Sequence, residues 1–165
     1  MRAVLDRASL RGADACHTVF HDASMVAADF SGARLVGASF ERADVRGANF
    51  ARADLHRAML VASQLGGSKF QGARLAEAVL DDADLSGADL SHADCARAFF
   101  RHADLRHMNH DGANWQEANV HGAQGVAVGR PWHLCRHTDA ALLMAEQYDP
   151  SDAVAMASHA AGRRT

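Results

Sequence analysis

The sequence predicts an all-β solenoid with four-sided coils, and three periodic features support this prediction. A large, usually apolar residue stands at nearly every fifth position from Leu5 to Val120, and the phase never slips. An alanine precedes almost every one of these residues by two positions, from Ala3 to Ala123. A further pattern of charge repeats every twenty residues. Short periods of this kind are typical of chains whose coils stack on one another and bury each other's apolar residues.

Each five-residue unit is expected to form one side and one corner of a coil. The alanine and the large residue are two positions apart, so on an extended segment both point inward and the residue between them points outward. The next two residues are often polar or glycine, as in Ser31-Gly32 and Ser86-Gly87, and glycine accepts the positive φ of a tight corner. Neither the helical spacing of 3.6 nor the strand spacing of 2 fits this pattern.

Four sides are expected to complete one coil. Every phenylalanine at the large position stands at an even multiple of five, so bulky and slimmer sides alternate; these residues are Phe20, Phe30, Phe40, Phe50, Phe70 and Phe100. Outward charges alternate in sign at a spacing of twenty, and these are Asp14, Arg34, Asp54, Arg74 and Asp94. Coils stack about 4.8 Å apart, so these charges are predicted to form a ladder. The β-helix domain is expected over residues 1–127, in about six coils.

With this pattern the chain resembles a pentapeptide-repeat protein. The pattern of that family is alanine, Asp or Asn, Leu or Phe, and two variable residues, and it stands here as Ala-Asp-Leu-His-Arg at 53–57 and Ala-Asp-Leu-Ser-Gly at 83–87. The resemblance covers about three quarters of the chain and implies a right-handed quadrilateral β-helix. The best-studied members bind DNA gyrase as mimics of duplex DNA and confer fluoroquinolone resistance or toxin immunity.

A short, mainly helical tail is expected over residues 128–165. Gly129-Arg130-Pro131 breaks the repeat, and the cap signals and breakers that follow predict helices over about 139–148 and 152–161. The candidate contact residues of the tail are Leu143, Met144 and Tyr148. Two compatible roles are open: the tail caps the exposed last coil, or it joins two chains, as the resemblance to gyrase-binding relatives implies.

Function is expected on the outward positions, where one side carries an unusual apolar stripe. Met59, Val79 and Phe99 occupy three successive outward positions on the same side, and Val61 stands at the neighbouring corner. Contiguous exposed apolar surface usually marks a contact. The sequence therefore predicts a partner or dimer face here; the alternatives are that the tail covers it or that it has no role.

Charge is distributed unevenly along the chain. Residues 1–76 hold seven acidic and ten basic side chains, whereas residues 77–127 hold nine acidic and three basic ones. The densest acidic zone comprises Asp81, Asp82, Asp84, Asp89 and Asp94. A negative rod imitates duplex DNA, whose phosphates dominate protein contacts, and the resemblance then implies DNA gyrase or topoisomerase IV as partner. The alternative is that each aspartate serves the backbone of its own repeat.

Catalysis, metal binding and cofactors are not expected. The chain has no recognisable Ser-His-Asp arrangement, phosphate-binding glycine loop or nucleotide fingerprint. His133, Cys135 and His137 supply three potential metal ligands, but structural zinc sites usually need four, from two separated pairs. Direct binding of nucleic acid is not expected either, because Phe99 is the one aromatic residue expected on the solenoid surface.

The compartment is expected to be the cytoplasm. The repeat begins at Ala3, which leaves no room for a signal peptide, and no apolar run is long enough to span a membrane. The three cysteines, Cys16, Cys95 and Cys135, are expected to be free thiols.

Two classes of function remain. The first is a modulator or protector of a type II topoisomerase, which acts through the acidic surface. The second is a protein-binding scaffold or effector-associated module, which uses the apolar stripe and the tail. Electrostatic mimicry is expected to weaken steeply with salt, and apolar docking is not.

Overall fold

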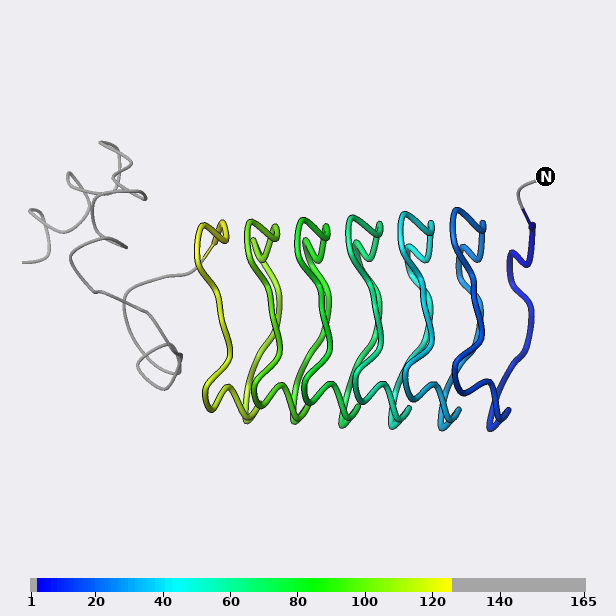
Figure 1. The fold of residues 1–165 in the computed structure, drawn as a ribbon, viewed down its shortest axis with the longest axis horizontal. Helices are drawn as coiled ribbons and strands as arrows, with labels where there is room; N and C mark the ends of the chain where they lie inside the picture. The colour runs from blue at the N-terminus through cyan, green and yellow to red at the C-terminus, as the bar shows by residue number, and fades with distance from the viewer. Residues whose placement is uncertain (1–2, 126–165) are drawn as a thin grey trace, which may run out of the picture.

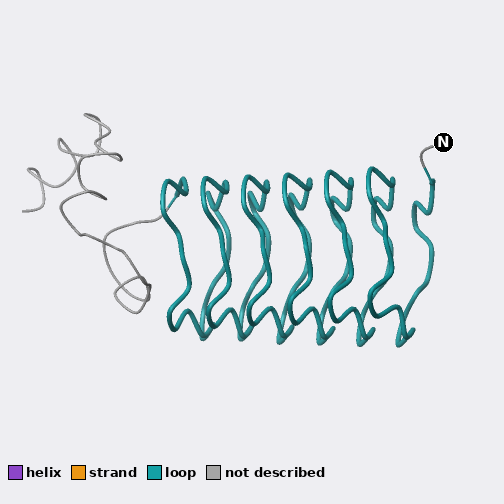
Figure 2. Ribbon diagram, viewed as in Figure 1, coloured by secondary structure: helices purple, strands orange, loops and turns teal. Residues whose placement is uncertain are grey.

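The computed structural model describes residues 3–125, which form a continuous stack of coils (Figure 1). Within this range there is no helix and no strand longer than a single bridge residue, so the whole ribbon is loop and turn (Figure 2). Each outward residue forms a parallel bridge with the residue twenty positions later, from Val4 with Ser24 to Asp104 with Gln124. The twenty-residue spacing confirms the predicted four-sided coil.

The four sides of the coils form four faces, which we number in chain order by their outward residues. Face 1 carries Ser24, Asp44, Gln64, Asp84 and Asp104. Face 2 carries Asp29, Asn49, Lys69, Asp89 and Asn109. Face 3 carries Asp14, Arg34, Asp54, Arg74, Asp94 and Asn114. Face 4 carries Val19, Ser39, Met59, Val79, Phe99 and Asn119. Face 4 therefore lies opposite face 2.

Hydrogen bonds between coils and within corners hold the stack together. At one repeat, the Phe30 N–H donates to the Asn49 carbonyl in the next coil, and the Asn49 N–H donates back to Ala28. Across the corner the Ala33 N–H donates to the Phe30 carbonyl, which closes a tight turn. The backbone N–H and C=O groups of each side thus form their hydrogen bonds with neighbouring coils, although no side is a long strand.

Every corner places its second residue at positive φ. Glycine occupies some of these positions, as predicted, but fifteen are not glycine, including Arg57 and Asp82. Most residues avoid this conformation, because it brings Cβ against the backbone. The corner N–H compensates by donating to the next coil, as the Arg57 N–H does to the Ala76 carbonyl. The stacking of the coils, rather than residue preference, therefore fixes the corners.

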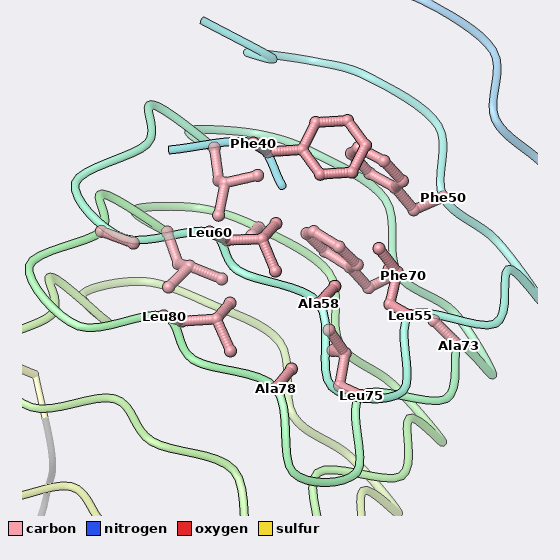
Figure 3. Packing of buried hydrophobic residues seen from close by; sticks show 14 of the residues in the cluster. Phe40, Phe50, Leu55, Ala58, Leu60, Phe70, Ala73, Leu75, Ala78 and Leu80 are labelled. Carbon is pink, nitrogen blue, oxygen red and sulfur yellow. The ribbon is translucent and has the colours of Figure 1, made fainter. Parts of the chain in front are cut away.

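The interior is filled by the inward alanine and large residues. From Ala23 to Leu105 every large residue and every alanine at these positions is buried. The phenylalanines form two stacks that meet edge to face. The ring centroid of Phe50 lies 4.9 Å from those of both Phe30 and Phe70, and 5.8 Å from that of Phe40. Figure 3 shows Phe40, Phe50 and Phe70. These spacings are those of favourable aromatic pairs.

Several sequence-based predictions fall at or beyond the ends of the described range. The last two residues of the predicted domain 1–127 and the whole tail, 128–165, lie outside the described residues, together with Leu143, Met144 and Tyr148. Among the cysteines, Cys95 is buried in the core and Cys16 is partly exposed, both as free thiols. No helix in residues 3–125 is long and apolar enough to cross a membrane.

Candidate functional site

Face 4 presents an apolar column at its centre. The bridges from Met59 to Val79 and from Val79 to Phe99 place the three side chains in successive coils. Phe99 is 40% exposed, and the other two are half-buried. Val61 lies half-buried at the corner that leads to face 1. The structure therefore brings the four residues of the predicted stripe together on one side of the solenoid.

The corner between faces 3 and 4, the 3/4 corner, borders this column with charges of alternating sign. Its second residues in successive coils are Arg57, Glu77, Arg97 and Glu117. The Arg57 Nε donates to Glu77 at 2.8 Å, and the Arg97 Nε donates to Glu117 at 3.2 Å. The hydrogen bond from Arg57 holds the pKa of Glu77 below its ordinary value. The sequence analysis missed this row, although its twenty-residue spacing is visible in the sequence.

A shallow hollow of about 290 Å³ opens in the same corner. Its lining residues are Ala76, Glu77, Ala96, Arg97 and Gln116. The two alanines leave this space because they stand where the adjacent coils carry His56 and Gln116. Small-molecule sites are usually deeper and more enclosed. The hollow is therefore a shallow depression in the surface beside face 4.

The corner between faces 4 and 1, the 4/1 corner, borders the other side of the column. The backbone N–H of Arg101 donates to Asp81 Oδ1 at 2.9 Å, and its guanidinium donates to Oδ2. Asp81 is only 6% exposed. The hydrogen bonds and the charge of Asp81 raise the pKa of Arg101. The Asp81 carboxylate is therefore paired with Arg101 and plays a structural role, whereas Asp82 beside it is exposed.

The other predicted acidic residues lie on three different faces. Asp84 belongs to face 1, Asp89 to face 2 and Asp94 to face 3. Together with Asp81 and Asp82 they lie around a single coil, because residues 81–94 make up most of one twenty-residue coil. The acidic zone is thus a belt across the solenoid and not a row along it.

Each of these three carboxylates also accepts a hydrogen bond from the backbone two residues later. Asp84 accepts from the Ser86 N–H and Asp89 from the Ser91 N–H, both at 2.9 Å. Asp94 accepts from the Ala96 N–H at 3.2 Å. Burial raises the pKa of Asp89, but its hydrogen bonds outweigh this and leave the pKa below its ordinary value. These three aspartates thus serve the local backbone, as the alternative left open by the sequence expects.

The ladder predicted on face 3 is present as separate ion pairs. Arg34 pairs with Asp14, and Arg74 pairs with Asp54 at 3.2 Å. Both arginines are largely exposed, so each pair contributes little to stability. Within residues 3–125 no group of three or more His, Cys, Asp or Glu side chains is placed to hold a metal ion.

Comparison with known proteins identifies the repeat. A family model described as pentapeptide repeats matches residues 3–42, 33–72, 60–94 and 68–106. A trypsin-treated form of QnrB1, a plasmid-mediated fluoroquinolone resistance protein, is 19% identical with a TM-score of 0.50, over 74% of this chain and 73% of QnrB1. This likeness concerns the fold.

Two further solved structures match with lower structural scores. HetL, a pentapeptide repeat protein involved in heterocyst differentiation regulation in the cyanobacterium Nostoc sp. strain PCC 7120, is 30% identical with a TM-score of 0.30, over 74% of this chain and 63% of HetL. A pentapeptide repeat protein from the Arabidopsis thaliana thylakoid lumen is 27% identical with a TM-score of 0.38, over 66% and 65%. The chain thus spans less than two thirds of either. No curated protein sequence matches significantly.

Proposed function

The chain belongs to the pentapeptide-repeat family of right-handed quadrilateral β-helices, and on this premise we propose that it is a non-catalytic protein-binding solenoid whose contact surface is face 4. The observation that carries the proposal is the column of Met59, Val79 and Phe99. Its central side chains stand outside a core that is already filled by other residues.

The composition of face 4 suits a protein partner. Interfaces commonly have an apolar centre and a polar rim, and their hot spots are enriched in aromatic residues. Phe99 and Val79 supply the centre, and the charged 3/4 and 4/1 corners supply the rim. The shallow hollow at the 3/4 corner offers no enclosed site for a small substrate.

The test replaces the column by charge and leaves the coil intact. Met59→Asp with Phe99→Asp is expected to fold, because aspartate already stands at many outward positions, such as Asp54. Lys69→Asp on the opposite face 2 changes the net charge by the same amount and serves as control. Proteins retained on immobilised wild type are identified by mass spectrometry and tested again as purified proteins.

We expect the double variant to bind the purified partner at least about 30-fold more weakly than wild type, as loss of a hot spot implies. The Lys69→Asp control is expected to keep full affinity. Equal affinity of wild type and the double variant for every retained protein would remove face 4 as the contact surface.

A second candidate function is modulation or protection of DNA gyrase or topoisomerase IV by mimicry of duplex DNA. The observation that favours it is the absence of any ion pair at Asp82, Asp84, Asp89 and Asp94 within the described residues. The charge of Asp82 acts on Arg101, and that of Asp84 acts on Arg46 and Arg106, but without direct pairing. This coil therefore stays negative, and a negative surface attracts a site built for phosphates.

The matched test removes these charges and keeps the hydrogen bonds. Changing all four residues to asparagine is expected to preserve the fold. At the three outward positions, Asn49 and Asn109 show that asparagine accepts the same backbone hydrogen bond. At the corner position of Asp82, asparagine tolerates the positive φ. In a supercoiling assay, with and without a fluoroquinolone, wild type is expected to inhibit supercoiling or to protect from drug-induced cleavage. The effect is expected to weaken with salt and to vanish in the variant.

The control for this test carries Asp29→Asn and Asp54→Asn, outside the acidic zone. It is expected to behave as wild type. An effect that survives in the fourfold variant, or that does not respond to salt, would argue against mimicry and for face 4.

A further inference from the structure

We propose that face 4 binds a second copy of this chain, antiparallel, about a two-fold axis that crosses the face between the coils of Val79 and Phe99. The inference rests on the proposed function, since it names the occupant of the same face. A two-fold interface uses one patch twice and must be complementary to itself. The borders of face 4 meet this requirement on both sides.

The antiparallel arrangement fixes which residues meet. The axis lies in the interface, perpendicular to the stacking direction, so each corner meets the same corner of the second copy with the coil order reversed. Both copies have the same spacing of about 4.8 Å per coil, so the register holds along the contact. Val79 then faces Phe99 of the second copy, and Phe99 faces Val79.

The 3/4 corner is complementary to itself in this register. Glu77 meets Arg97 of the second copy, and Arg97 meets Glu77. One coil further out, Arg57 meets Glu117. Each intrachain pair thus faces a pair of reversed polarity. The pair of Arg57 with Glu77, at 2.8 Å, faces the pair of Glu117 with Arg97 of the second copy. The two copies together therefore form two networks of two ion pairs each.

The 4/1 corner is complementary in the same register. The corner of the buried Asp81 faces that of Arg101 of the second copy, and the exposed Asp82 faces His102. The intrachain pair of Asp81 and Arg101 again faces its own reverse. The 4/1 corner is therefore compatible with the axis that the 3/4 corner favours.

An axis that passes through a coil, or a parallel arrangement of the two chains, places like charges together. If the axis passed through the coil of Val79, Glu77 would meet Glu77 and Arg57 would meet Arg97. If the two chains ran parallel, the 3/4 corner would meet the 4/1 corner, with Glu77 against Asp82 and Arg97 against Arg101. Juxtaposed like charges suppress wrong pairings, so the charge pattern favours an antiparallel dimer whose axis lies between two coils. Among such axes, the one between the coils of Val79 and Phe99 gives a partner of opposite charge to all four charged residues of the 3/4 corner. An axis between Met59 and Val79 would leave Arg97 against Gly37.

The contact is modest in size. It runs over the four coils from Met59 to Asn119, roughly 15–20 Å at the spacing of stacked coils. Specific interfaces of this extent lie at the small end of the known range. Dimerisation is therefore expected in the micromolar range of concentration, and binding of another protein to face 4 would compete with it.

Charge reversal tests the pairing directly. Glu77→Arg puts arginine against Arg97 of the second copy, and Arg97→Glu puts glutamate against Glu77. Each variant alone is expected to sediment as a monomer of 17.6 kDa at concentrations where wild type is dimeric. Mixed together, the two variants are expected to form a heterodimer, and the double variant is expected to restore the homodimer.

The full chain is used throughout, and circular dichroism checks that each variant is folded. A wild type that stays monomeric up to about 1 mM, or single variants that dimerise like wild type, would overturn the antiparallel dimer. The first of these results leaves the proposed function intact if Met59→Asp with Phe99→Asp still abolishes binding of a purified partner. A heterodimer of the two variants would establish the register even if no other protein binds.

Discussion

Phe50→Ala is expected to lower the free energy of unfolding by about 3–5 kcal/mol, the usual cost of removing a buried phenylalanine. Phe50 is fully buried and stacks between Phe30 and Phe70, with its edge toward Phe40. Its removal opens a cavity that both neighbouring coils line. Because a solenoid coil contacts only the coils beside it, no distant part of the core can relax to fill the space.

The measurement is chemical unfolding followed by circular dichroism. Phe50→Leu is the matched control and is expected to cost about 1 kcal/mol, since Leu10 and Leu90 stand at the same position two coils away in either direction. A loss below about 1 kcal/mol for Phe50→Ala would show that the stack closes over the gap and that the aromatic column is not rigid.

Ala58→Leu is expected to destabilise the fold by roughly 2–3 kcal/mol through overpacking. Ala58 is fully buried and points into the filled interior (Figure 3). Side chains larger than serine occupy this position in the described repeats only at Thr18 and Met108, both half-buried near the ends of the stack. The interior coils thus have no room for a longer side chain there.

Ala113→Leu near the end of the described stack supplies the control for overpacking. Ala113 is only partly buried, so leucine there is expected to cost less than about 1 kcal/mol. Unfolding of both variants is measured under identical conditions. Equal losses at positions 58 and 113 would mean that the backbone conformation, rather than interior volume, restricts this position to small residues.

The apolar column of face 4 was predictable from the sequence, because outward residues twenty positions apart share a face. The alternating row from Arg57 to Glu117 obeys the same rule. It was missed because only outward positions, and not corners, were sorted by side. The acidic zone, by contrast, was defined by residues that are close in sequence. In a solenoid such residues lie around one coil and not along one face. The five aspartates consequently lie on three faces and one corner.

Some contacts in the corners follow from stacking alone. The imidazole of His17 lies over Gly37 in the next coil, with Nδ1 2.6 Å from where a Cβ would stand. His92 lies over Gly112 at the same separation. A side chain at either glycine would force the imidazole to move, so glycine permits this close approach. The sequence shows both residues, but only the stacked coils show that one covers the other.

The sequence by itself determined the side, the corner, the coil of twenty residues and the direction of each side chain. The reason is that only one alignment of the five-residue repeat places the alanine and the large residue in the interior. The tertiary structure decided the electrostatics. It paired Asp81 with Arg101, tied Asp84 and Asp89 to the backbone and left Asp82 exposed. These outcomes depend on the reach of side chains between and within neighbouring coils, which a linear pattern does not specify.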